Sequence, residues 1–127
     1  MVQDQQILLL VYNIQTGDKL EQYRQIIQEI LTEHSQVKPV YGEIAMKLVF
    51  DRERDRYQLL RTGWQGDRRV FGALIHIDIE DGKIWIQYDS TEIGVANELT
   101  DQGIPKTDIV LAYHAPFMRQ YNGFAIA

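Results

Sequence analysis

The sequence contains no cysteine, and this absence removes several classes of site at once. A disulfide scaffold, a thiolate metal site and a cysteine nucleophile are all excluded. A chain without cysteine suits a reducing compartment, so we expect the protein in the cytoplasm.

A long hydrophobic run and an excess of positive charge are also missing. The longest apolar run, residues 7–12, spans six positions, whereas a membrane helix needs about twenty, so no membrane contact is expected. Thirteen Lys and Arg residues are set against eighteen Asp and Glu residues, a net charge of −5. Proteins that bind duplex DNA on their own are usually more basic, because they neutralise phosphates. Any contact with nucleic acid is therefore expected to be indirect.

What is present is the composition of one small globular domain, 127 residues with 45% hydrophobic and 24% charged side chains. Residues 13–17 interrupt the pattern, which predicts an N-terminal extension over 1–17 and a single domain over 18–127. Apolar residues recur at three- and four-residue steps over 18–34, which predicts a helix. We expect Asp18 to cap this helix and Glu21 to complete a capping box.

Alternating apolar residues then predict four strands, over 43–50, 57–64, 70–79 and 83–88. Short turns join them, so an antiparallel meander is expected. The strongest turn signal is Asp81-Gly82, which suits a type I′ hairpin. A second helix is predicted over 92–100, with Ser90 or Thr91 as its cap and Ile93 among its inward residues, followed by a short strand over 109–113. The predicted fold is α+β: an N-terminal helix packed on a four-stranded antiparallel meander, then a second helix and a short C-terminal strand region.

The Asp81-Gly82 hairpin also predicts which residues share a face of the sheet. Counting outward from the turn pairs Ile79 with Ile84, Ile77 with Ile86 and Ile75 with Tyr88, and this face is expected to be the core beneath the first helix. The other face pairs Asp78 with Trp85 and His76 with Gln87. The second strand adds either Leu60 and Trp64 or Leu59 and Tyr57 to that other face. Exposed apolar area usually marks an interface, so we predict a homo-oligomer formed through a face that includes Val70, Leu74, His76 and Trp85.

Few residues are placed for catalysis or metal binding. His76, Asp78 and Glu80 alternate on one strand, and an imidazole beside a carboxylate is able to act as a base or a metal ligand. A polar patch on the sheet explains the same three residues, and His34 and His114 have equally ordinary explanations as a helix-end cation and a loop hydrogen-bonding group. We therefore predict no catalytic, cofactor-binding or metal site, and keep an enzyme or metal protein using His76, Asp78 and His114 as an alternative.

Positive charge is concentrated in one segment. Residues 51–72 carry six arginines and four acids, whereas residues 73–108 carry eight acids and two lysines. Arginine suits bidentate pairing with carboxylate or phosphate, and a tryptophan between arginines stacks on a guanidinium or a base. Pairing of these arginines with the protein's own acids is the competing explanation. The residues we predict for contact with a partner or nucleic acid are Arg61, Trp64, Arg68 and Arg69.

Taken together, several stretches from residue 18 onward resemble the XisI family, the fdxN-element excision controlling factors of cyanobacteria. They are KLEQYRQIIQEIL (19–31), FDRERDRYQLLRTGWQGDRRVFG (50–72), HIDIEDGKIWIQYDSTEIGVANEL (76–99), GIPKTDIVLAYHAP (103–116) and YNGFAIA (121–127).

The resemblance implies an accessory protein that acts beside an XisH-like protein and a site-specific recombinase in programmed DNA excision. XisH-like proteins resemble restriction-type nucleases, so an inhibitor-like role toward such a partner is a second implication. The family offers no established catalytic motif to carry over, which agrees with the prediction of no enzyme activity.

Overall fold

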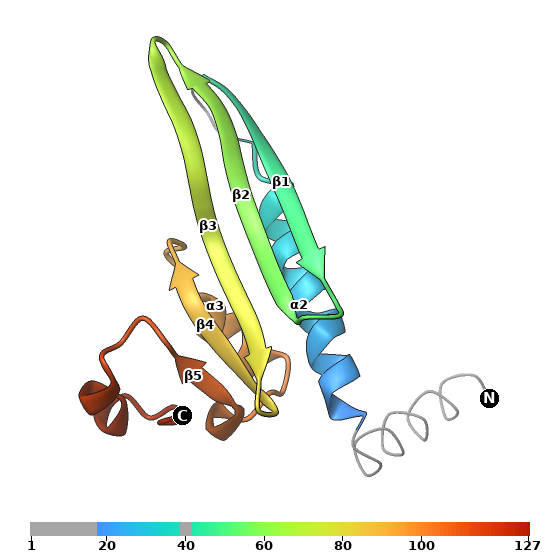
Figure 1. The fold of residues 1–127 in the computed structure, drawn as a ribbon, viewed down its shortest axis with the longest axis vertical. Coiled ribbons are helices and arrows are strands. Elements are labelled where there is room, and N and C mark those ends of the chain that lie inside the picture. The colour runs from blue at the N-terminus through green and yellow to red at the C-terminus, as the bar shows by residue number, and fades with distance from the viewer. Residues whose placement is uncertain (1–17, 39–41) are drawn as a thin grey trace, which may run out of the picture.

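The computed structural model describes residues 18–38 and 42–127, and it has the predicted α+β architecture (Figure 1). The predicted extension over 1–17 lies outside the described residues. The sheet has the order β1-β2-β3-β4-β5, with β1 to β4 antiparallel and β5 parallel to β4. No helix among the described residues is long and apolar enough to cross a membrane. In chain order the elements are α2 (Lys19–Ser35), β1 (Glu43–Asp51), β2 (Arg56–Gln65), β3 (Arg68–Glu80), β4 (Lys83–Asp89), α3 (Val95–Asp101), η1 (Lys106–Asp108), β5 (Ile109–Leu111) and η2 (Pro116–Tyr121).

Helix α2 forms as predicted and covers one face of the sheet, which we call the inner face. Its apolar stripe buries Tyr23, Ile27, Ile30 and Leu31. The predicted capping box is wrong, because the Asp18 side chain makes no capping hydrogen bond. The main-chain oxygen of Asp18 accepts the first hydrogen bonds of the helix, from the N–H groups of Glu21 and Gln22, and the Glu21 carboxylate pairs with two arginines.

A partly buried ion pair holds α2 to the turn between β1 and β2. The Arg24 guanidinium donates to both carboxylate oxygens of Asp55, with Nε–Oδ1 at 2.7 Å and Nη2–Oδ2 at 3.1 Å. The Tyr57 hydroxyl donates to the same carboxylate at 2.8 Å. Asp55 itself has a φ of 56°, in the left-handed region that aspartate and asparagine tolerate better than most residues. Asp55 therefore joins the β1–β2 turn to α2 instead of facing solvent.

The β3–β4 hairpin follows the predicted register near its turn and departs from it further out. Ile79 pairs with Ile84, Asp78 with Trp85 and Ile77 with Ile86, and the four isoleucines are buried. Beyond Ile77 a bulge shifts the register, because β4 carries one extra residue there. The predicted partners are therefore wrong at two positions: the residue opposite His76 is Tyr88, and the residue opposite Ile75 is Asp89.

A second bulge, between β2 and β3, corrects the predicted oligomer face. Tyr57 and Leu59 lie in the core, so the other predicted alternative, Leu60 and Trp64, takes the outer face of the sheet. The register shifts between Leu59 and Leu60, with Leu74 as the extra residue on β3. Leu74 consequently packs against the core.

Helix α3 begins later than predicted. It starts at Val95, whose N–H donates to the Asp89 carboxylate at 2.7 Å. The N-cap residue is Gly94, not Ser90 or Thr91 as predicted, and Ile93 therefore lies outside the helix and is 65% exposed instead of facing inward.

The C-terminal segment is tied to the sheet. Ala125 forms a parallel bridge with Val110 of β5, and its N–H donates to the Ile109 oxygen at 2.9 Å. Arg119 of η2 reaches three main-chain oxygens, those of Ala112, His114 and Ile126. The same guanidinium lies 5.7 Å from the centre of the Trp85 ring. Trp85, expected to be an uncovered residue of the outer face, is therefore half-buried beneath the C-terminal segment.

Candidate protein-interaction surface

The β2–β3 hairpin extends far beyond the end of β4 (Figure 1). Strand β4 pairs only with residues 75–80 of the thirteen-residue β3. We call the remaining hairpin, residues 60–73, the arm. The start of β1 runs beside it, since Ile44 lies opposite Gly63. The arm is thus a three-stranded ribbon that projects from the body of the protein.

The four residues predicted for partner contact all lie on the arm. Trp64 and Arg69 are opposite each other across the hairpin, and the guanidinium lies 5.3 Å from the centre of the indole ring. Arg61 lies opposite Gly72, and Arg68 lies opposite Gln65 next to the turn. All three arginines are exposed, and no acidic side chain pairs with them among the described residues. The alternative that the arginines pair with the protein's own acids holds for Arg52, Arg54 and Arg56, but among residues 18–38 and 42–127 it does not hold for the three on the arm.

The two faces of the arm differ in character. The alternation of the strands places Trp64, Arg69 and Phe71 on the outer face, where Trp64 is 50% and Phe71 is 71% exposed. The inner face carries Arg61. A hollow of about 230 Å³ opens on the arm among residues of β1, β2 and β3, with lining residues from both faces. Its lining is Ile44, Arg61, Gln65, Arg68, Arg69, Val70 and Phe71. Aromatic and arginine side chains of this kind are enriched at the centres of protein interfaces.

The predicted oligomer face is not brought together as one surface. Val70 lines the hollow on the arm and Leu74 packs against the core, whereas His76 and Trp85 lie on the outer face of the body. The bulge at Leu74 accounts for this separation, because the extra residue reverses the alternation of β3 beyond it.

His76 belongs to a closed hydrogen-bond network on the outer face. Its Nε2 lies 2.8 Å from Asp78 Oδ1, and its Nδ1 lies 2.7 Å from Gln58 Nε2. Arg56 pairs with the carboxylates of Asp78 and Glu80 at 3.5 Å and 3.2 Å. Both imidazole nitrogens are therefore within hydrogen-bond distance of neighbouring side chains.

The other two histidines are also held by neighbours. His34 at the end of α2 contacts both carboxylate oxygens of Glu98 at 2.9 Å. His114 Nδ1 lies 3.1 Å from the side-chain nitrogen of Asn122. Within residues 18–38 and 42–127, no three His, Asp or Glu side chains form a group that would hold a metal ion.

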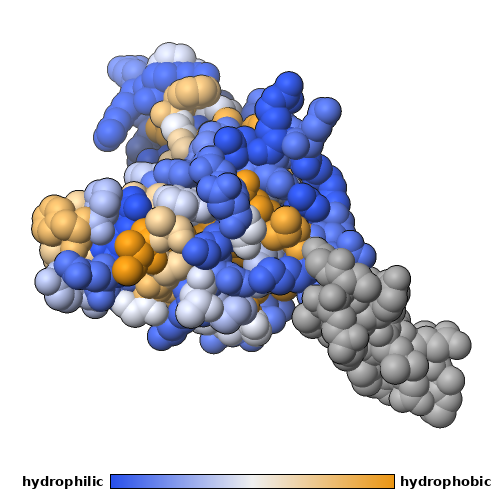
Figure 2. Space-filling model, turned by 60° about the horizontal axis from the view of Figure 1, so that its bottom comes forward, coloured by the Kyte–Doolittle hydropathy of each residue, from blue (hydrophilic) through white to orange (hydrophobic). Residues whose placement is uncertain are grey.

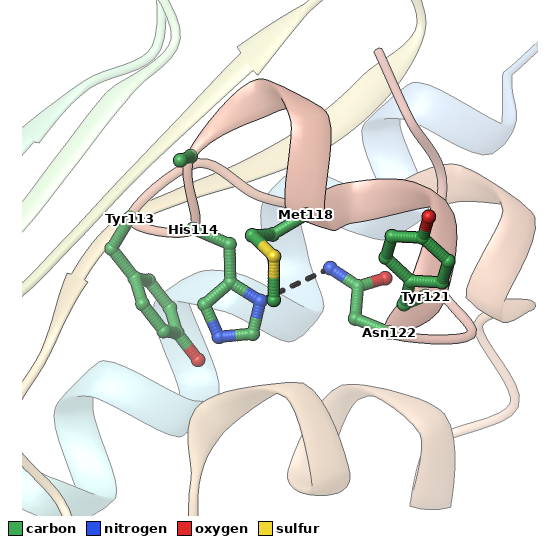
Figure 3. A pocket seen from close by; sticks show the side chains of 6 residues that line it. Tyr113, His114, Met118, Tyr121 and Asn122 are labelled. Atoms are coloured by element: carbon green, nitrogen blue, oxygen red, sulfur yellow. Dashed lines mark hydrogen bonds between the residues drawn. The ribbon is translucent and has the colours of Figure 1, made fainter.

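A second exposed surface, which the sequence analysis missed, surrounds His114. A hollow of about 360 Å³ is lined by Tyr113, His114, Ala115, Met118, Tyr121 and Asn122. Figure 3 shows the His114 ring between Tyr113 and Met118, with Asn122 on the far side. Figure 2 shows apolar atoms at this end of the molecule, over η2. Burial and the nearby Asp89 carboxylate raise the pKa of Tyr113. The feature of the sequence that could have indicated this surface is the density of aromatic residues over 113–121.

Comparison with known proteins agrees with this architecture. Among curated proteins, no sequence is similar enough to match the chain. A XisI-like protein from Anabaena variabilis, solved by crystallography, is 39% identical to this chain in sequence. The two structures match with a TM-score of 0.77, over 85% of this chain and 99% of that one. A second crystal structure, of the fdxN element excision controlling factor XisI from the same organism, is also 39% identical, with a TM-score of 0.75, over 86% of this chain and 99% of that one. The family model described as XisI protein matches residues 17–126. The chain therefore belongs to the XisI family.

Proposed function

We propose that this protein is a non-enzymatic accessory factor in the excision of a DNA element, and that it acts by binding an XisH-like protein through the arm. The relative from Anabaena variabilis is named as an excision controlling factor, and a controlling role needs a surface for another protein. The observation that carries the proposal is the arm itself, which presents Trp64 and three unpaired arginines away from the body.

The state of the histidines supports a role without catalysis. A general base needs a nitrogen that is free to take a proton from the substrate. Both ring nitrogens of His76 are hydrogen-bonded, to Gln58 and Asp78. The Nδ1 of His114 is hydrogen-bonded to the Asn122 side chain. His114 follows β5, whereas His76 and Asp78 lie on β3. The alternative enzyme site of His76, Asp78 and His114 would have to dismantle these contacts first.

A pull-down with the purified XisH-like protein of the same organism tests the proposal. Replacing both Trp64 and Arg69 with alanine should reduce the captured amount at least tenfold, because the stacked pair is exposed near the tip of the arm. Phe117→Ala is the matched control, since Phe117 is 70% exposed but lies on η2. Equal capture by wild type and the double variant, or no capture at any salt concentration, would refute docking through the arm.

Two neighbouring proposals differ in what the arm contacts or causes. Direct DNA binding is favoured by the unpaired Arg61, Arg68 and Arg69, and it predicts steep salt dependence that weakens in an Arg68→Ala/Arg69→Ala variant. Flat titrations of duplex and single-stranded DNA at low salt would dispose of it. Inhibition of a nuclease-like XisH partner predicts that added protein lowers that partner's DNA cleavage.

A further inference from the structure

The edge of the arm on the β4 side has no partner strand. Strand β4 ends its pairing opposite Ile75, and the main-chain oxygen of Leu74 is taken by Ser90 N–H at 2.9 Å. Residues 68–73 of β3 therefore present an open edge within the part of the chain that the structure describes. An open edge of this kind is a template for pairing with another strand, and proteins usually block or cover it.

The hairpin geometry tells which main-chain groups point out of this edge. The arm turns through two residues, Gly66 and Asp67, with Gln65 opposite Arg68. In such a hairpin the residues flanking the turn exchange hydrogen bonds, and every second pair does so after them. Arg68, Val70 and Gly72 thus bond to β2, whereas Arg69, Phe71 and Ala73 direct their N–H and C=O groups outward.

We propose that this edge pairs in antiparallel fashion with the same edge of a second copy of the protein, about a two-fold axis at Val70. In that register Val70 lies opposite its own copy, and Arg69 lies opposite the second copy's Phe71. A guanidinium beside an aromatic ring is a favourable cross-strand pair. Pairing of identical edges also closes the assembly at two copies.

The neighbouring registers are each disfavoured by one contact. A two-fold axis at Arg69 would set two guanidinium groups directly opposite, and like charges in that position destabilise a sheet. An axis at Phe71 would set the turn residues Gly66 and Asp67 opposite His76 and Ile75, which already pair with β4. In the register centred on Val70 the two Arg69 side chains are not opposite each other, and the pairing ends with Asp67 opposite Ala73, short of the residues that pair with β4.

The distribution of charge also favours a second copy of the protein as the partner of the open β3 edge. The arm carries three arginines and one aspartate, whereas residues 81–127 carry six acids and three bases. The proposed pairing brings the tip of each arm toward residues 89–92 of the other copy, which include Asp89 and the exposed Glu92. The basic end of one protein thus meets the acidic part of its partner, which favours association.

Strand β1 offers another open edge, and it is less suited to self-pairing. The fullest antiparallel overlap of two β1 strands centres on Lys47, which sets lysine against lysine and Glu43 against Asp51. A lysine on an edge strand is one of the means by which proteins prevent such pairing. Pairing through β3 leaves both faces of the arm open, so Trp64 stays available for the partner protein proposed above, whereas Arg69 takes part in both contacts. The dimer and the partner docking are therefore tested by separate measurements, the mass of the protein alone and the capture of the partner.

Because the chain contains no cysteine, single-cysteine variants test the register directly. Residues opposite each other in a non-hydrogen-bonded antiparallel pair have Cα atoms about 4.5 Å apart, inside the range of about 4.4–6.8 Å that a disulfide spans. Val70→Cys should therefore give a covalent dimer under mild oxidation. Ala73→Cys is the matched control on the same edge, because its partner in this register is Asp67. Lys47→Cys is the control on the other edge.

Light scattering of the full chain completes the test. The wild type should have twice the mass of the 14.8 kDa chain, and Phe71→Pro should be monomeric, because proline removes an outward N–H without disturbing the ladder to β2. Phe71→Ala keeps that N–H and should weaken the dimer less. Circular dichroism of each variant separates loss of pairing from loss of fold. A monomeric wild type, or cross-linking by Lys47→Cys or Ala73→Cys instead of Val70→Cys, would overturn the proposal. A dimer that fails to capture the XisH-like protein would refute only the proposed function.

Discussion

Replacing Asp55 with asparagine should destabilise the fold by about 2 kcal/mol at neutral pH. The substitution removes the negative charge of the carboxylate that accepts two hydrogen bonds from Arg24 and one from Tyr57. Breaking a fully buried ion pair costs about 3–5 kcal/mol and an exposed one contributes about 0–1 kcal/mol. The two side chains are 24% and 15% exposed, which places this pair between those limits. For a chain of this length, 2 kcal/mol corresponds to a fall in Tm of about 8 °C.

Asparagine isolates the electrostatic part of this effect. It tolerates the left-handed backbone of Asp55 as aspartate does, so the backbone cost is unchanged. Asp55→Ala should lose about 1 kcal/mol more for that reason. Asp51→Asn is the control at the same turn, because Asp51 pairs with an Arg54 side chain that is 74% exposed; its loss should be clearly smaller.

The effect should fade in acid. Burial alone would raise the pKa of Asp55, but the hydrogen bonds from Arg24 and Tyr57 and the positive charge of Arg24 outweigh it, so the net pKa is lowered. The folded-state pKa therefore lies below the ordinary value of 3.8. The stabilisation is then complete well above that value and is lost as the pH falls through the folded-state pKa. Urea unfolding of wild type and Asp55→Asn at pH 7, 4 and 2.5 measures this. Equal stability at pH 7, or a difference that persists undiminished at the lowest pH, would refute the reasoning.

Three further predictions use other contacts. Gly63→Ala should lower the free energy of unfolding in urea by about 3 kcal/mol or more, because a Cβ there would lie 1.9 Å from the Glu43 oxygen. In Gly72→Ala the new Cβ meets nothing within 4 Å, so the free energy of unfolding should fall by about 1 kcal/mol or less. Equal losses in the two variants would contradict the close approach at Gly63. Burial and the hydrogen bond to Asp55 raise the pKa of Tyr57 above its ordinary value of 10. The stability of the wild type should therefore fall as the pH rises above 10. Unfolding compared at pH 8 and 11 should show a smaller fall in Tyr57→Phe, which has no hydroxyl to titrate. Arg119→Ala should lose about 2–3 kcal/mol by thermal unfolding, because it leaves three main-chain oxygens without their donor; recovery in Arg119→Lys would show that charge alone suffices.

The sequence was most informative where a local signal decides the geometry. The Asp81-Gly82 turn sets its hairpin register through its own backbone conformation, and the pairs next to it are as predicted. The same counting failed after Ile77, since a bulge depends on packing across the sheet and leaves no mark in the alternation. One missed bulge at Leu74 moved Leu74 and Val70 away from Trp85. The capping of α3 failed similarly, because Asp89 lies six residues before the N–H that it binds.

The candidate surface was predictable in its residues but not in its shape. Clustering of Arg61, Trp64, Arg68 and Arg69 in one hairpin follows from the turn between them. That the hairpin projects depends on how far β4 extends beside β3, and only the three-dimensional pairing gives that length. The hollow around His114 depends on Arg119 folding the chain back over Trp85, a contact that spans segments with no common pattern.

No helix of the part of the chain that the structure describes packs along the arm, so the arm and the body should differ in how readily their amides meet solvent. Amides in the body are shielded by α2, α3 and the core, whereas those of residues 60–73 rely on their ladder alone. Hydrogen exchange should therefore be fast along the arm and slow in the body, with the arm opening as a separate unit. Binding of the arm, by a strand of a second copy or by another protein, should slow hydrogen exchange in residues 60–73.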